Sequence, residues 1–238
     1  MSAFETLIYE KQDNIAYVTL NRPKVLNAYN IQMRDELYQI LSAIRDDPDV
    51  TCAIFKGQGE KAFCAGADLT EFLTAPSPTI ARRVRFERDV WGLFLSLPQP
   101  IIVALHGYVL GDGLEIALCC DIRIASEDAK LGMPELGLGI IPAAGGTQTL
   151  PRAVGKAKAF EMLYTGRHVD AEDARSIGLV NRVVPRDKLL ATAEEIASKI
   201  VSHDQKAVRK VKEAIVRGLD MPLTAGLELE KTLAKEKL

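Results

Sequence analysis

Apolar residues in the first half of the chain alternate between short continuous runs and helical spacing. The runs are rich in β-branched residues and bounded by Gly, Pro or Asn, which is typical of buried strands. They predict strands at residues 15–20, 51–55, 61–64, 101–105 and 121–125. Between them, helices are expected at residues 80–97 and 113–120, and a longer one after the candidate cap Asn30. Its apolar face comprises Ile31, Leu37, Ile40, Leu41 and Ile44.

The second half of the chain carries mainly the helical pattern. Residues 131–146 are rich in Gly and Pro and predict a long shaped loop. Strands that alternate with helices, followed by helices alone, indicate an α/β protein. We divide it into a core at residues 1–186 and a helical C-terminal region at residues 187–238. The predicted helices of this half lie at residues 157–163, 171–177, 187–201, 205–216 and 223–238.

The length and net charge of the chain limit the classes of protein to which it can belong. The chain has 238 residues, 47% of them hydrophobic, and a formal net charge of −2. That is enough for one substantial core, and the low charge argues against wholesale nucleic-acid binding while leaving local basic patches open. Residues 90–111 carry no formal charge, but Pro98 and Pro100 interrupt them. We therefore expect a helix end, a turn and a buried strand there, and no membrane span.

The cysteines and the first residues bear on location and metal binding. Cys52, Cys64, Cys119 and Cys120 form no CxxC pair, and no histidine stands at ligand spacing, so no metal site is expected. The start of the chain contains acidic residues and no apolar segment of a signal peptide. We expect a cytoplasmic protein with reduced thiols.

Three segments concentrate the residues that could carry chemistry. Residues 63–68 (FCAGAD) are small and sit where a strand turns toward a helix, so a ligand can approach the backbone N–H groups. Residues 110–115 (LGDGLE) place glycines and Glu115 at the start of a short helix, whose dipole favours negative charge. The segment is no dinucleotide fingerprint, because Ile116 stands where a third glycine belongs. Taken alone, the first segment is more simply an ordinary tight turn, and Glu115 could be an acid that only favours the helix dipole.

The third segment, residues 133–147, places Glu135 in an apolar loop. Desolvation there raises the pKa of a carboxyl group toward the range of a general acid. The alternative is a surface-loop acid. Two neighbouring carboxyl groups tend to share one proton, which makes an acid and a base from one residue type. Two backbone N–H donors can stabilise a carbonyl that becomes an enolate.

The motifs of the whole chain resemble the enoyl-CoA hydratase/isomerase, or crotonase, superfamily. The resemblance rests on several segments in the usual order and spacing. They are NRPKVLNA at 21–28, GEKAFCAGADL at 59–69, PQPIIVALHGYVLGDGLEIALCCDIRIAS at 98–126, AKLGMPELGLGIIPAAGGTQTLPRAVG at 129–155 and TGRHVDAEDARSIGLVNRVVP at 165–185.

This resemblance implies a crotonase-like spiral of ββα repeats, with C-terminal helices that build homotrimers, often paired as hexamers. It implies an acyl-CoA thioester as substrate, with coenzyme A as part of the substrate and no separate cofactor. The backbone N–H groups of Ala67 and Asp112 match the family's oxyanion hole, and Glu115 and Glu135 match its two catalytic glutamates. Residues at the family's CoA and substrate contacts are Lys24, Val25, Ala28, Ala65, Asp68, Leu69 and Gly111.

Because both glutamates are kept, the resemblance favours hydration of a 2-enoyl-CoA over an isomerase or a dienoyl-CoA hydratase. Two features depart from the family. Asp112 stands where glycine is usual, and we expect its side chain to point away from the site or to bind a polar part of the substrate. The chain also ends before a further helix and basic tail that most members carry, which leaves the cover of the nucleotide end unassigned.

Several other residues admit two interpretations. Arg82, Arg83, Arg85 and Arg88 could face CoA phosphates or solvent, and the basic helix at residues 206–217 could bind phosphate or RNA, or be a solvated face. The RNA-binding alternative makes the protein a non-catalytic binding protein. Trp91 and Phe94 could line an acyl pocket or pack in the core, and Cys64 is expected to pack as a small residue.

Overall fold

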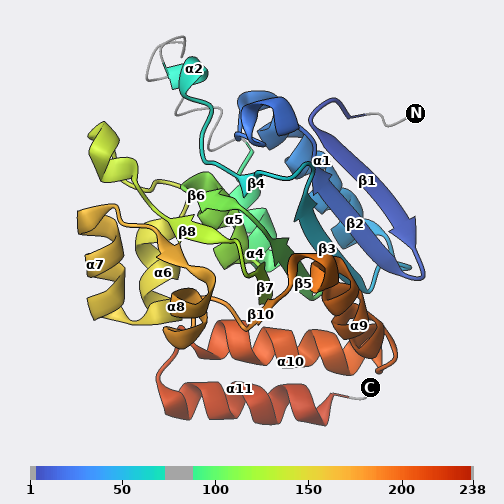
Figure 1. Ribbon diagram of the computed structural model, residues 1–238. Coiled ribbons are helices and arrows are strands. Elements are labelled where there is room, and N and C mark those ends of the chain that lie inside the picture. The colour runs from blue at the N-terminus through green and yellow to red at the C-terminus, as the bar shows by residue number, and fades with distance from the viewer. Residues whose placement is uncertain (1–3, 73–87, 237–238) are drawn as a thin grey trace.

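The computed structural model describes residues 4–72 and 88–236, and its strands form two sheets (Figure 1). The larger sheet has six strands in the order β1-β2-β3-β5-β7-β10. β1 is antiparallel to β2, and the other neighbours are parallel. These strands are β1 Leu7–Gln12, β2 Ile15–Leu20, β3 Cys52–Gly57, β5 Ile101–Leu105, β7 Ile122–Ser126 and β10 Arg182–Val184.

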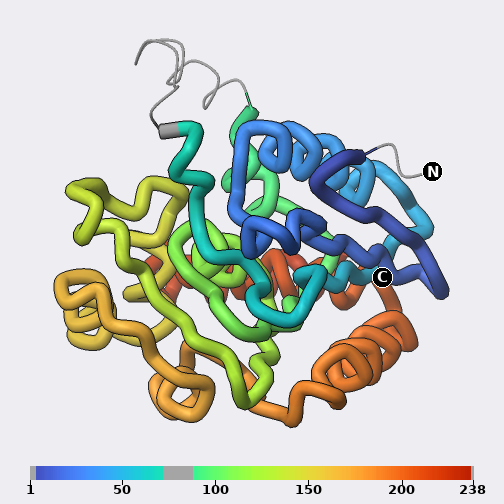
Figure 2. The backbone as a smooth tube through the Cα atoms, turned by 45° about the horizontal axis from the view of Figure 1, so that its top comes forward, coloured from blue at the N-terminus to red at the C-terminus, as the bar shows by residue number. Residues whose placement is uncertain are grey.

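The smaller sheet has four strands in the order β4-β6-β8-β9. The chain visits the larger sheet and then the smaller one in each turn, from β3 to β4, from β5 to β6 and from β7 to β8. Figure 2 shows these successive segments side by side. The repeats wind into the spiral that the family resemblance implies. The strands are β4 Ala62–Cys64, β6 Tyr108–Leu110, β8 Lys130–Gly132 and β9 Val169–Asp170.

The larger sheet is covered on both faces, which explains its continuous apolar runs. Successive side chains of a strand point to opposite faces. In β3, Ala53 and Phe55 therefore join the main core, whereas Cys52 and Ile54 join a second cluster. Helix α9, Leu189–Val201, closes that second cluster with Leu189, Ala193 and Ala197.

Helices of the first half cover the main core. In α1, Ile31–Asp46, the side chain of Asn30 accepts the N–H of Met33 at 2.9 Å, so Asn30 is the predicted cap. The apolar face is buried as expected except for Ile31, which is 46% exposed. The other helices here are α2 Leu69–Phe72, α4 Val90–Ser96 and α5 Asp112–Cys119, with a 3-10 turn, η1, at Pro23–Val25.

The helix expected at residues 80–97 falls partly outside the described residues, which show α4 at its end. The loop expected at residues 131–146 is wrong in part, because β8 ends there and a 3-10 helix, η2, occupies Glu135–Leu138. A helix that the pattern did not predict, α6, spans Gly146–Val154.

Helices dominate the end of the chain, as predicted. They are α7 Lys156–Thr165, α8 Ala171–Ser176, α9, α10 Gln205–Gly218 and α11 Leu223–Lys235, with the 3-10 turn η3 at Arg186–Lys188. α10 and α11 pack against each other below the larger sheet (Figure 1). Lys212 links α10 to the segments that precede β5 and β7. Its Nζ donates to the carbonyl of Gln99 at 2.8 Å and to Asp121 at 2.7 Å. No helix in the described part of the chain is long and apolar enough to cross a membrane.

Candidate active site

A cavity of about 1070 Å³ lies beside the ends of β4, β6 and β8 and the η2 region. Its walls come from the turn after β4, the start of α5, the segment from η2 to residue 144, and the start of α1. Glu115 and Glu135 both line it, together with Ala67 and Asp112. The tertiary structure therefore brings the four predicted catalytic and oxyanion-hole residues to one cavity.

The turn after β4 orients the backbone of Ala67. Tyr29 forms a parallel bridge with Ala67, in which the N–H of Tyr29 donates to Gly66 O and the N–H of Asp68 donates to Tyr29 O, each at 2.8 Å. In a parallel bridge these two groups flank the central residue, so the N–H of Ala67 points to the side opposite Tyr29. That geometry presents the N–H of Ala67 as a backbone donor beside the cavity.

The second turn is the start of α5, where Asp112 is the first helical residue. The first N–H groups of a helix have no acceptor within the helix, and they carry the positive end of its dipole. Gly111 before it has φ +50, and a Cβ there would lie 3.1 Å from Glu135 Oε1 and 3.4 Å from Gly66 Cα. Glycine at this position lets both turns and the Glu135 carboxyl group lie close together.

Glu115 is 1% exposed and is held by the chain that enters α6. Its Oε1 accepts the N–H groups of Ala144 at 2.9 Å and Gly146 at 2.7 Å. Burial raises the pKa of Glu115 to about 8, the charge of Asp112 and a hydrogen bond with it act in the same direction, and the two N–H groups oppose them. Glu115 is thus a carboxyl group held in a fixed position, and its pKa lies above the ordinary range of a glutamate.

Glu135 begins η2 and is half-buried. Its Oε2 is buried and has no hydrogen-bond partner in the described structure. Burial raises the pKa of Glu135, and the nearby charge of Glu115 raises it further. A carboxyl oxygen without donors favours the neutral form, which is the form of a general acid.

The expectation that the Asp112 side chain points away from the site is wrong. Asp112 is half-buried, lines the cavity, and lies close enough to Glu115, one turn further along α5, to raise the pKa of that carboxyl group. Side chains three residues apart on a helix lie on the same face, which explains their proximity. The site therefore contains three carboxyl groups where the sequence indicated two.

The residues predicted to contact CoA and substrate fall in different places. Ala65, Leu69 and Gly111 line the main cavity. Asp68 lines a neighbouring cavity of about 260 Å³ and pairs with Arg22 at 2.9 Å. Lys24 lines a third, of about 280 Å³, beside Lys61. Val25 and Ala28 line none of these three cavities.

Several cavity residues were not singled out by the sequence. Tyr29 and Arg34 come from the segment around the start of α1, and Ala144 comes from the loop before α6. Of the two residues that the sequence offered for an acyl pocket, Trp91 lines the cavity, with its ring centroid 5.7 Å from that of Tyr29 and the planes tilted by 43°, whereas Phe94 is fully buried against Phe55. Only the motif NRPKVLNA, which ends one residue before Tyr29, could have drawn attention to this wall.

Other predicted features are now placed. Cys64 is fully buried and burial raises its pKa to about 12, as expected of a packing residue. Arg82, Arg83 and Arg85 lie outside the described residues, and Arg88 pairs with Asp35 at 2.7 Å. In residues 4–72 and 88–236, no three His, Cys, Asp or Glu side chains are placed to hold a metal ion.

Comparisons with known proteins agree with this architecture. The crystal structure of an enoyl-CoA hydratase from Bacillus anthracis superposes with a TM-score of 0.92 at 41% identity, over 97% of this chain and 90% of that one. The fold is therefore that of the crotonase-type enzymes. The crotonyl-CoA hydratase of Syntrophomonas wolfei is 42% identical over 96% of this chain and 88% of the relative. The short-chain-enoyl-CoA hydratase of Clostridium acetobutylicum is also 42% identical, over 94% and 86%.

The family model described as enoyl-CoA hydratase/isomerase matches residues 10–238. With nearly the whole chain matched, and with relatives above 40% identity over most of their length, the protein belongs to the enoyl-CoA hydratase/isomerase family.

Proposed function

We propose that this protein is a hydratase that adds water to the double bond of a 2-enoyl-CoA thioester and forms a 3-hydroxyacyl-CoA. The observation that carries the proposal is the pair of carboxyl groups on one cavity beside two backbone turns: the buried Glu115 and the half-buried Glu135, whose Oε2 is buried. The names of the crotonyl-CoA and short-chain-enoyl-CoA hydratases support it.

In the proposed reaction the thioester carbonyl oxygen accepts hydrogen bonds from the backbone N–H groups of Ala67 and Asp112. Negative charge develops on this oxygen as the enolate forms, and the dipole of α5 favours it. Fixed donors aimed at a developing charge lower the barrier because they need no reorganisation during the reaction.

Glu115 and Glu135 take opposite roles in this proposal. Glu135 is the acid that donates a proton to the α-carbon, because its buried Oε2 lacks a donor that would stabilise a charge. Glu115 is the base that takes a proton from water, because the N–H groups of Ala144 and Gly146 stabilise its ionised form. The step uses only water, the substrate and these side chains, so we propose no separate cofactor.

For substrate binding, we propose that Ala65, Leu69 and Gly111 contact the acyl and thioester part, since they line the main cavity. Lys24, Val25, Ala28 and Asp68 are proposed to lie along the nucleotide end of CoA. A phosphate site on α10 is less well supported. Lys210, Lys212 and Arg217 of this helix already pair with carboxylates: Glu236, Asp121 and Glu213.

We also propose that the protein forms homotrimers or hexamers and acts in the cytoplasm. Exposed apolar side chains on α10, on α11 and on the turn between them support an interface, led by Leu219 at 80% and Leu223 at 77% exposure. The four cysteines are buried and free, as in a reducing compartment. The division at residues 186 and 187 stays a proposal, in which the helical residues 187–238 form the oligomerisation region.

The function is tested by following the absorbance of the enoyl thioester with crotonyl-CoA. Wild-type enzyme should remove the band, and Glu115→Gln and Glu135→Gln should each lower kcat by about 10²- to 10⁴-fold, because each removes one proton-transfer group. The exposed Glu127→Gln serves as the control and should keep full activity.

Binding of a CoA thioester, measured by calorimetry, should persist in both active-site variants. If both variants keep wild-type activity, the two glutamates have other roles. If the wild type binds crotonyl-CoA without turnover, product analysis with dienoyl and cyclic thioesters decides between a dienoyl-CoA hydratase and an isomerase.

A further inference from the structure

The main cavity adjoins the neighbouring cavity of about 260 Å³ at one wall. Among the residues that the structure describes, those that line both cavities are Tyr29, Arg34, Ala67 and Asp112. Ala67 and Asp112 carry the backbone N–H groups proposed to hold the thioester oxygen. An acyl group bound through that oxygen therefore begins beside Tyr29 and Arg34, which belong to the segment around the start of α1.

The hydroxyl group of Tyr29 is a donor at this wall. Its oxygen is buried and has no hydrogen-bond partner in the described part of the chain. Burial raises the pKa of Tyr29, so the hydroxyl keeps its proton. A buried hydroxyl without a partner costs free energy, and native structures rarely leave one. A ligand that brings an acceptor to this wall removes that cost.

Arg34 supplies a second donor, which carries a positive charge. Its Nε and Nη2 donate to Asp35 at 3.0 and 2.8 Å, and Asp35 also pairs with Arg88 at 2.7 Å. One carboxylate thus serves two guanidinium groups. Nη1 of Arg34 takes part in neither of these bonds, so the guanidinium can still donate to a ligand. The side chain is 17% exposed, so water screens such a bond only weakly.

The charges around this wall act on a ligand in two directions. Arg34 and its neighbour Arg88 favour an anion, because they share the single charge of Asp35. Glu71 lines the smaller cavity and opposes an anion there, whereas Asp68 in the same cavity is paired with an arginine. An oxygen that accepts from Tyr29 and Arg34 can therefore be a carboxylate on the side of the main cavity, or a neutral oxygen.

The rest of the main cavity is suited to hydrocarbon. Its walls include Trp91, whose ring lies beside that of Tyr29, and Leu138, Ile140 and Ile141 from the segment after Glu135. An acyl chain that ends in a methyl group would satisfy these walls and leave the donors of the Tyr29 wall unpaired. A chain that carries an oxygen satisfies both.

We propose that Tyr29 and Arg34 are specificity-determining residues that bind an oxygen on the acyl group. The preferred substrate is then a 2-enoyl-CoA whose acyl chain carries a carboxylate or a hydroxyl group beyond the double bond. This inference rests on the proposed hydration and names its substrate class. A site built to donate hydrogen bonds discriminates strongly against an analogue that lacks the acceptor, because its buried donors are then left without partners.

The test compares kcat/KM for matched thioesters. The mono-CoA thioesters of 2-enedioic acids from five to eight carbons, and the ω-hydroxy-2-enoyl-CoAs, are each paired with the unsubstituted 2-enoyl-CoA of the same length. At the length that fits, the wild type should favour an oxygenated thioester by about 10- to 100-fold. The two series distinguish a subsite for a carboxylate from one for a neutral oxygen.

Tyr29→Phe and Arg34→Met should each lower this preference by about tenfold, because each removes one donor. The preference is a ratio within one protein, so a change in folding or in the oxyanion hole affects both thioesters alike. Tyr108→Phe and Arg45→Met are the matched controls. Tyr108 is 44% exposed, Arg45 pairs with the residue that follows it, as Arg34 does, and neither lines the two cavities. Both controls should keep the wild-type preference.

Two results overturn the inference while hydration stands. One is a wild type that hydrates the unsubstituted thioesters and favours no oxygenated partner at any length. The other is a preference that Tyr29→Phe and Arg34→Met leave unchanged, since other groups would then bind the oxygen.

Calorimetric binding of saturated thioesters is independent of turnover. The wild type should bind the mono-CoA thioester of a saturated dioic acid, or an ω-hydroxyacyl-CoA, more tightly than the acyl-CoA of the same length, and both variants should lose this difference. That result in a protein that hydrates none of the thioesters upholds the subsite and rejects the proposed function. Equal affinities reject the subsite, whatever the protein hydrates.

Discussion

The backbone N–H of Gly146 donates a 2.7 Å hydrogen bond to Oε1 of Glu115, although the two residues belong to different helices. Gly146 begins α6, and its packing against α5 gives Glu115 a fixed position in the cavity. Through this hydrogen bond, the position of Glu115 in the proposed reaction depends on the packing of two helices. Adding one methyl group at residue 146 tests this dependence.

Gly146→Ala should lower kcat/KM by about 100-fold, because small misplacements of catalytic groups carry such costs. A Cβ at this position would lie 2.9 Å from Glu115 Oε1 and from the sulfur of Met133, so the carboxyl group must move. The measurement is crotonyl-CoA hydration. Gly137→Ala is the matched control, because it lines the same cavity and its Cβ would meet nothing within 4 Å. Equal rates in both variants would show that Glu115 tolerates displacement.

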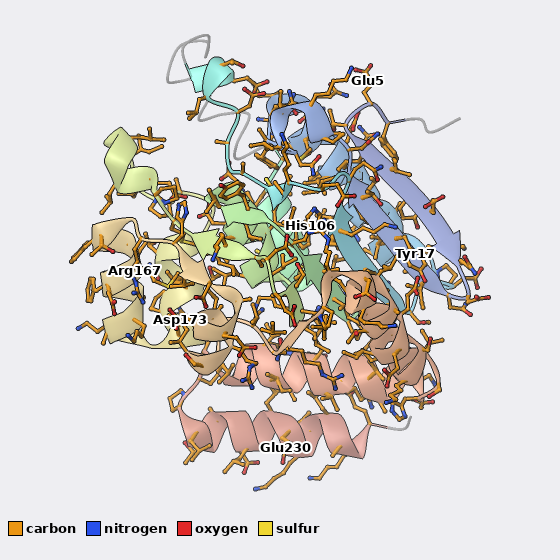
Figure 3. The ribbon with its side chains drawn as sticks, in the orientation of Figure 1. Glu5, Tyr17, His106, Arg167, Asp173 and Glu230 are labelled. Carbon is orange, nitrogen blue, oxygen red and sulfur yellow. The ribbon has the colours of Figure 1, made fainter. Side chains whose placement is uncertain are left out.

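The buried side chain of His106 should make the folded protein less stable in acid. It is 4% exposed, lies in the interior (Figure 3), and its Nε2 has no partner in the described structure. Burial lowers its pKa from 6.5 to about 4. Between pH 6.5 and 4, His106 is therefore protonated in the unfolded chain and neutral in the folded protein. Because the unfolded state binds the extra proton, the free energy of unfolding should fall by about 2–3 kcal/mol over this range.

Urea unfolding at several pH values measures this effect. His106→Gln should remove most of the pH dependence over that range, whereas His203→Gln, at an exposed position, should retain it. A wild-type curve that is flat from pH 6.5 to 4 would mean that His106 is not held neutral in the fold.

Asn27 should be a large contributor to stability near the β4 turn. It is fully buried at φ +55, its Oδ1 accepts the N–H of Arg22 at 2.8 Å, and its Nδ2 donates to Gln58 and Ala62 carbonyls at 2.9 Å. Asn27→Ala should reduce the free energy of unfolding by about 2–4 kcal/mol, because it leaves buried backbone groups unpaired at a conformation that alanine disfavours.

Asn14 offers a matched comparison for Asn27 in the same urea experiment. It also has positive φ, at 64°, but its side chain bonds the exposed carbonyl of Asp49. Asn14→Ala should cost about 1 kcal/mol, since water can replace the lost bond. Similar losses in both variants would contradict a special role for the buried network of Asn27.

The proposed oligomer should dissociate when charged residues replace the exposed apolar side chains at α10 and α11. Leu219→Glu combined with Leu223→Glu should convert trimers or hexamers into monomers, because it places two charges on the most exposed apolar side chains of that region. Sedimentation velocity measures the change. Leu95→Glu, at a 45% exposed position on α4, should leave the assembly intact. A monomeric wild type would reject the interface outright.

The chain's local pattern was enough to predict the central strands and most helices, since β3 and β5 are buried on both faces and read as continuous apolar runs. It failed where the local signal is weak. β1 is a largely exposed edge strand, β6 and β8 have three residues each, and α6 contains Pro151. The short strands become regular because a neighbouring strand supplies their hydrogen bonds, and α6 because it packs against α5 and α7.

For the site, the sequence by itself determined which residues could do the chemistry: glycines where the backbone must come close, and carboxyl groups at 115 and 135. Only the tertiary structure decided how they act together. The donors to Glu115 come from residues 144 and 146, and the side chain of Asp112 turns into the site against expectation. Burial and contacts between distant segments set these properties, and neither is encoded in local spacing.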